Sequence, residues 1–213
     1  MRSEPRWPAA LTILAVFALL LLLPNRVRVL PPWLLAVMGV AALGCLAGAA
    51  THSQSARWAG IERWAIFGLT VLGVMATVIM LRVLIHDMIH GSKAVDGLQM
   101  LASSIAIWAV NVTMFSLFYW QLDRGGPFGR VLDHRRPDWL FPQDQAPPED
   151  MPPDWRPQFI DYLFLGFSTA TAFSTTDALP LTGRAKFAMM SESSISLVTL
   201  VVVAARAINV LGT

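Results

Sequence analysis

The stretch that decides the fold is Gln158–Thr171, QFIDYLFLGFSTAT, together with the residues that follow it, AFSTTDALPLTGR at 172–184. The first part is apolar but has only 14 residues. As a helix it would reach about 21 Å, whereas the hydrocarbon core of a bilayer is about 30 Å thick. The second part is polar, and a long apolar segment follows it. This order predicts a re-entrant loop, which a membrane tolerates only where protein or a water-filled cavity covers the backbone.

The composition around this stretch is typical of a helical membrane protein. Of the 213 residues, 55% are hydrophobic and only 14% are charged, against about 25% charged in soluble domains. A cleaved signal peptide is an alternative for the first apolar segment, but no small-residue cleavage site follows it. We therefore expect an all-α integral membrane protein with five transmembrane helices and one re-entrant half-helix. The predicted spans are 8–23, 33–51, 64–85 with a possible extension to 90, 97–122 and 187–210.

Two regions are expected along the chain. Residues 1–96 form an N-terminal three-helix membrane region, and residues 97–213 form a second module around the re-entrant stretch. Within the second module, residues 123–157 carry most of the prolines of the chain's second half and several acidic residues. Because proline removes a backbone donor and disrupts helices, this segment is predicted to be an extended loop that faces solvent.

A set of residues on both sides of the polar return carries a resemblance. Thr169, Ala170 and Thr171 end the half-helix, and Asp177, Pro180 and Thr182 follow in the order Asp-x-x-Pro-x-Thr. Arg184 begins the next helix, which carries Glu192 and, 14 residues later, Arg206 after Ala205. This set resembles the pore module of the bacterial two-helix potassium channels. The resemblance implies that 97–122 is an outer helix, 158–182 a pore helix with a filter-like turn, and 187–210 an inner helix. It also implies a channel in a bacterial inner membrane.

The filter-like segment departs from the family at its glycines. The family pattern is Thr-Val-Gly-Tyr-Gly-Asp, and this chain has Ala172, Phe173, Ser174, Thr175, Thr176 and Asp177 in the same register. A column of inward-facing carbonyls needs backbone conformations that glycine adopts freely and β-branched residues resist. Hydroxyls and the Asp177 carboxylate would instead form polar and acidic rings. We therefore predict a weakly selective path for K⁺ or Na⁺ along Thr171–Asp177. The alternative is a closed loop that conducts nothing.

The last predicted helix has a polar stripe. Glu192, Ser196, Thr199 and Arg206 recur at helical spacing among apolar residues, and an ionisable residue inside a membrane marks a functional candidate. Two interpretations stay open. Glu192 bonds to the back of the pore helix while Arg206 reaches the far interface, or the stripe lines the ion path.

The charges conflict with the resemblance over orientation. Eleven of the 16 lysines and arginines lie on the side from which the predicted loop enters, and three lie on the other. The positive-inside rule places the loop side in the cytoplasm, whereas the resemblance places it outside.

One loop cannot enclose a path, so conduction implies a homotetramer. The expected partners are the lipid bilayer and this homo-oligomer, and nucleic acid is not expected. The sequence offers no motif for nucleic acid, a structural metal or catalysis, and the alternative function is a non-conducting structural or partner-binding membrane subunit.

Overall fold

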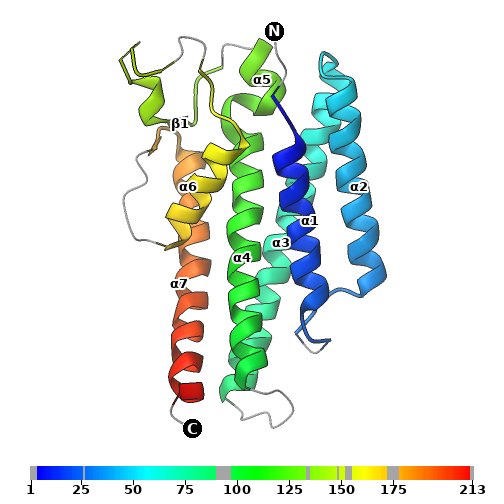
Figure 1. Ribbon diagram of the computed structural model, residues 1–213, viewed down its shortest axis with the longest axis vertical. Helices are drawn as coiled ribbons and strands as arrows, with labels where there is room; N and C mark the ends of the chain where they lie inside the picture. Colours follow the sequence, from blue (N-terminus) through cyan, green and yellow to red (C-terminus); the bar gives the residue numbers. More distant parts are fainter. Residues whose placement is uncertain are drawn as a thin grey trace.

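The computed structural model describes residues 4–25, 27–89, 97–132, 135–147, 149–151, 155–171 and 178–211 (Figure 1). Long helices run up and down along one axis, and α4, Gly97–Leu122, stands among the others. It packs against α1, Trp7–Leu22, on one side and against α7, Gly183–Leu211, on another. It also contacts α3, Ala56–Ile89, which is 34 residues long. The predicted all-α architecture is confirmed.

Among the described residues, four helices are long and apolar enough to cross a membrane. They are α2 at Pro32–Thr51, α3, the stretch Leu98–Val131 that contains nearly all of α4, and the part of α7 at Gly183–Ala205. Helix α1 is apolar but has only 16 residues, a length of about 24 Å. It lies on α2 and α4 with Ile13 fully buried. These helices are consistent with the predicted all-α integral membrane protein. The number of five spans stays a prediction.

Small residues allow the N-terminal helices to pack closely. Gly39 of α2 faces the ring of Phe17 on α1, where an added Cβ would come within 3.1 Å of the ring. Gly48 faces Trp58 of α3, and an added Cβ would come within 2.3 Å of that ring. Close approach of backbones through small residues is how membrane helices gain van der Waals contact without a hydrophobic driving force.

One end of the bundle is capped by the segment between α4 and α6. After the 3-10 turn Asp123–Gly125 the chain forms α5, Gly126–Leu132, then β1, Trp139–Leu140, and a second 3-10 turn, Pro142–Asp144. Gly125 and Gly126 both have φ of +84°, a conformation that favours glycine, and they turn the chain out of α4. Strand β1 pairs antiparallel with β2, Leu179–Pro180, with Trp139 opposite Pro180.

Helix α6, Phe159–Thr171, is the short helix that the sequence predicts. It starts near the capped end, descends obliquely beside α4 and α7, and ends partway down the bundle (Figure 1). The next described residues, at β2, are again at the capped end, where α7 begins (Figure 1). The chain therefore goes down with α6 and comes back before α7 starts.

Three expectations need correction. The third helix begins at Ala56 rather than at 64 and ends at Ile89, within the possible extension to 90, and the last helix begins at Gly183 rather than at 187. The segment 123–157 is not simply an extended loop facing solvent, because it contains α5 and β1. Pro127 is tolerated because it lies in the first turn of α5, where its missing N–H has no partner to lose, and Trp139 is fully buried.

Candidate functional site

The depth of α6 in the bundle is set by contacts with α7. The Ser193 hydroxyl donates to the backbone carbonyl of Thr169 at 3.2 Å. Ser193 lies ten residues after Gly183, the first residue of α7, which corresponds to about 15 Å along the axis. The last turn of α6 is therefore held well inside the bundle, while Tyr162 in its first turn is held at the capped end.

The predicted filter-like residues are only partly described. Thr171 is the last residue of α6, and its hydroxyl bonds to the Phe167 carbonyl of its own helix at 2.9 Å. Residues 172–177, which include Ala172, Phe173, Ser174, Thr175, Thr176 and Asp177, lie outside the described residues. Arg206 belongs to α7, and its side chain is likewise outside the described part.

The polar stripe of α7 packs against α4 within the chain. Glu192, Ser196 and Thr199 are all buried, none more than 1% exposed. The Asn111 amide on α4 donates to the Ser196 hydroxyl at 2.9 Å and to the Glu192 backbone carbonyl at 3.4 Å. Glu192 and Ser196 of the predicted stripe are thus brought together against a helix of the same chain, whereas Thr199 bonds to the Ile195 carbonyl of its own helix.

Glu192 lies where α4, α6 and α7 meet. Its Oε2 accepts a hydrogen bond from the Tyr119 hydroxyl at 2.5 Å. Its Oε1 has no hydrogen-bond partner among the described residues, and neither have Asn111 Oδ1 and Thr169 Oγ1. Gly166 allows α6 to come close here, because an added Cβ would lie 2.4 Å from Ser116 Oγ and 3.4 Å from Glu192 Oε1. We call these residues of the three helices the polar junction. Its members are Asn111, Ser116, Tyr119, Gly166, Thr169, Glu192, Ser193 and Ser196.

A second set of buried polar residues fixes the capped end, and sequence reasoning missed it. Asp123, which is fully buried, accepts from the Tyr162 hydroxyl at 2.6 Å and from the Asp138 backbone N–H at 2.7 Å. Arg130 donates to the Tyr162 oxygen at 3.3 Å and stacks over the Tyr162 ring at 5.0 Å. The base of α6 is thereby tied to the end of α4 and to α5.

The return of the chain into α7 is tied to the same place. The Asp138 carboxylate accepts hydrogen bonds from two guanidinium nitrogens of Arg184, at 2.6 and 2.7 Å, and from the Thr182 hydroxyl at 2.6 Å. The Leu181 backbone N–H donates to the Asp138 carbonyl at 2.8 Å. A bidentate arginine pair gives geometric precision as well as energy, so the segment that leaves the filter-like residues is rigidly placed.

The N-terminal segment joins this network. The Glu4 carboxylate accepts from Arg130 at 2.8 Å and from the Trp120 indole at 2.6 Å. Arg6 forms a buried ion pair with Glu62 of α3 at 3.0 Å. No local spacing could reveal these pairs, because Glu4 and Arg130 are 126 positions apart. The one available signal was that acids and arginines occur beside apolar segments, where burial demands a partner.

The outer surface of α6 and α7 carries large apolar side chains that the described part of the chain leaves exposed. Ile160, Phe164 and Phe167 of α6 are exposed, as are Phe187 and Leu197 of α7.

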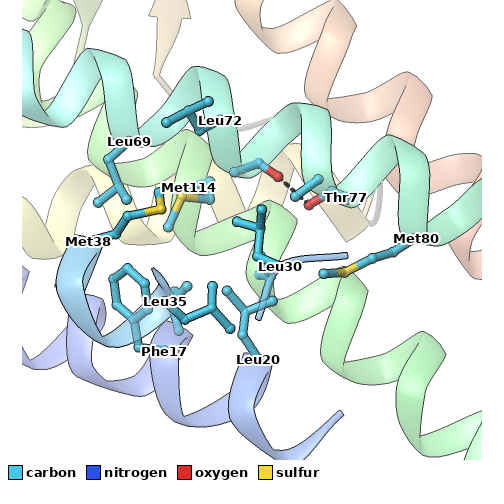
Figure 2. Close-up of a pocket in the computed structure, with 14 residues that line it drawn as sticks. Phe17, Leu20, Leu30, Leu35, Met38, Leu69, Leu72, Thr77, Met80 and Met114 are labelled. Carbon is cyan, nitrogen blue, oxygen red and sulfur yellow. Dashed lines mark hydrogen bonds between the residues drawn. The ribbon is translucent and has the colours of Figure 1, made fainter. Parts of the chain in front are cut away.

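A second apolar region is a pocket between α1, α2, α3 and α4, shown in Figure 2. Thr77 is a polar residue on its wall, and its hydroxyl bonds to the Gly73 carbonyl at 2.9 Å. None of the residues that line this pocket is titratable, so we interpret it as packing space between helices.

Comparison with protein family models, with curated proteins and with solved structures finds no match to this chain. The functional argument therefore depends on the residues and geometry described above.

Proposed function

We propose that the protein is a pore-loop cation channel or channel-like membrane protein, weakly selective between K⁺ and Na⁺. The observation that carries this proposal is the half-length helix α6, whose last turn is held by Ser193 about 15 Å along α7. The chain returns to the capped end before α7 begins. In a membrane this geometry would make α6 a re-entrant half-helix and place residues 172–177 beside its inner end.

The electrostatics of α6 favour a cation at that inner end. The aligned peptide dipoles of a helix place partial negative charge at its C-terminus, and α6 ends at Thr171, partway along the bundle (Figure 1). The sequence adds the hydroxyls of 174–176 and the Asp177 carboxylate directly after it. Polar and acidic rings select cations by charge, while the absence of both family glycines argues against a potassium-type carbonyl column.

Conduction through a single loop requires several chains around one axis, and four is the number that the resemblance implies. The exposed apolar side chains of α6 and α7 would supply the surface for lipid or neighbouring subunits. We place the protein in a bacterial inner membrane on the same resemblance. Its orientation stays open, because the charge count and the resemblance disagree.

A specific observation favours the second candidate, a non-conducting structural or partner-binding subunit. Glu192 and Ser196 of the stripe are buried and bonded to residues of α4, which supports a role in packing rather than in lining a path. A helix that packs its polar face inside its own chain would suit a closed, channel-like fold equally well.

Flux and oligomeric state separate the two candidates. The purified protein, reconstituted in liposomes, should pass both K⁺ and Na⁺ with little discrimination, and it should be a tetramer in detergent. Asp177→Asn should lower cation flux, whereas Asp150→Asn, a change at an exposed acid in the capping segment, should leave it unaltered. A monomer without flux would favour the structural subunit, and strong preference for K⁺ would contradict our interpretation of the missing glycines.

A further inference from the structure

Helix α1 is shorter than the helix on which it lies, and a hollow opens beside its end. Helix α1 has 16 residues and α4 has 26, which correspond to about 24 Å and about 39 Å. At the end of the bundle opposite the cap, α1 stops before α4 does (Figure 1). The hollow there has a volume of about 450 Å³. It is lined by the end of α1 and the first turns of α4, through Leu19, Leu22, Leu23, Pro24, Gln99, Ala102, Ser103 and Ala106.

The hollow is mostly apolar and open to the outside of the bundle. Leucines line it on the side of α1, and alanines line it on the side of α4. The Ser103 hydroxyl donates to the Gln99 carbonyl of its own helix at 2.7 Å, so its proton is already used. Leu22 is 81% exposed. From Gln99 to Ala106 the hollow extends about 10 Å along α4. An open apolar hollow of this shape between membrane helices suits a hydrocarbon chain.

A positive charge borders the same hollow. The Arg28 guanidinium donates to the Leu21 carbonyl at 3.2 Å and to the Asn25 side chain. It is thereby held at the end of α1, next to Leu22, which lines the hollow. A guanidinium has five N–H donors, so three remain after these two bonds. The ion pairs found among the described residues do not include Arg28.

An arginine beside an apolar hollow is complementary to one class of molecule. Guanidinium groups bind phosphate through paired hydrogen bonds, and basic sites between transmembrane helices bind lipid headgroups. The end of a membrane-spanning bundle lies at the depth where such phosphates occur. Because Arg28 has no acidic partner among the described residues, a headgroup with a net negative charge is favoured over a zwitterionic one.

We propose that this hollow binds one anionic phospholipid, with an acyl chain between the end of α1 and α4 and the headgroup phosphate on Arg28. The lipid would complete the short side of the bundle, because it covers the part of α4 that α1 does not reach. The site uses no residue of α6 or α7. It therefore does not depend on the proposed function and would exist whether or not the protein conducts.

The test is thermal unfolding of the full-length protein in a neutral detergent, titrated separately with phosphatidylglycerol, with phosphatidylcholine of the same acyl chains and with inorganic phosphate. A ligand that binds only the folded state raises the melting temperature by mass action. We expect half-saturation with phosphatidylglycerol at about fivefold lower concentration than with phosphatidylcholine, the usual effect of one arginine next to an anionic lipid. Inorganic phosphate lacks the acyl chain and should give no saturable rise at these concentrations. Equal half-saturation for the two lipids, or a saturable rise with inorganic phosphate, would overturn the proposal.

Two variants and their matched controls locate the effect. Arg28→Gln should bring half-saturation with phosphatidylglycerol to the value for phosphatidylcholine, whereas Arg57→Gln, at an exposed arginine of α3, should leave it unaltered. Ala102→Leu fills the hollow and should weaken the binding of both lipids. Ala36→Leu, at an exposed alanine of α2, is its control.

Undiminished phosphatidylglycerol binding in either Arg28→Gln or Ala102→Leu would overturn the proposal. None of these measurements depends on ion flux. Lipid binding without flux would count against the channel alone, and flux without selective lipid binding would count against this site alone.

Discussion

The Ser193 hydroxyl of α7 donates to the Thr169 carbonyl of α6, and this single hydrogen bond links the inner end of the half-helix to the middle of a long helix. Thr169 O belongs to the last turn of α6, where carbonyls have no partner within the helix. The bond therefore gives this carbonyl a partner on α7, and it fixes how deep α6 reaches.

Removing this bond should loosen α6. Ser193→Ala should reduce the free energy of unfolding by about 1 kcal/mol, the usual net value of an intramolecular hydrogen bond, as measured by denaturation in detergent. Ser191→Ala and Ser194→Ala are matched controls, because these hydroxyls are exposed and bond only within α7. Equal losses in all three variants would mean that the contact with Thr169 does not hold α6.

Adding one methyl group at Gly166 should separate α6 from α4. The new Cβ would lie 2.4 Å from Ser116 Oγ and 3.1 Å from the Val112 carbonyl oxygen, and such overpacking costs roughly 1–3 kcal/mol. We expect Gly166→Ala to lower the melting temperature. Gly68→Ala on α3 has open space around the new Cβ and should be neutral or slightly stabilising. A neutral Gly166→Ala would show that the helices do not cross this closely.

The Tyr119 hydroxyl should stabilise the folded protein through its hydrogen bond to Glu192. Tyr119→Phe removes the described donor to the Glu192 carboxylate, and leaving a buried acceptor unpaired costs about 1–3 kcal/mol. In a double-mutant cycle with Glu192→Gln, measured by chemical unfolding, the two losses should be clearly non-additive, because the residues are in contact. Additive losses would remove the proposed pairing.

The pair between Asp138 and Arg184 should stabilise the return of the chain. Arg184→Ala leaves the fully buried Asp138 without its charged partner. Because the Arg184 side chain is itself 55% exposed and screened by solvent, we expect a loss of only about 1 kcal/mol. Lys186→Ala, at an exposed position in the same helical turn, is the control. Limited proteolysis near β2 should be faster in Arg184→Ala than in the unchanged protein. Cleavage at an unchanged rate would argue against a positioning role for Arg184.

The sequence predicts the long helices and α6 well because each coincides with a continuous apolar run. The predicted half-helix, 158–171, agrees with α6 at Phe159–Thr171, since its length and the polar residues after it are local signals. The stripe of Glu192, Ser196 and Thr199 was also visible, because helical spacing places these residues on one face. Their partner was not visible, because periodicity says which side chains share a face and does not say which helix covers it.

The contacts at the capped end could not be predicted either, because they join residues that are far apart in the sequence. Asp123, Arg130 and Tyr162 meet only because α4, α5 and α6 fold together. Helix α5 was missed because the proline content of its surroundings suggested an extended chain, although proline in a first turn is compatible with a helix. The filter-like residues 172–177 stay a prediction.

The anchoring of α6 also orders events during synthesis. Both residues that secure the half-helix and its return, Ser193 and Arg184, belong to α7, the last helix of this sequence. When α6 leaves the ribosome, neither has yet been made. The contacts that hold α6 beside α7 can therefore form only after α7 has been synthesised.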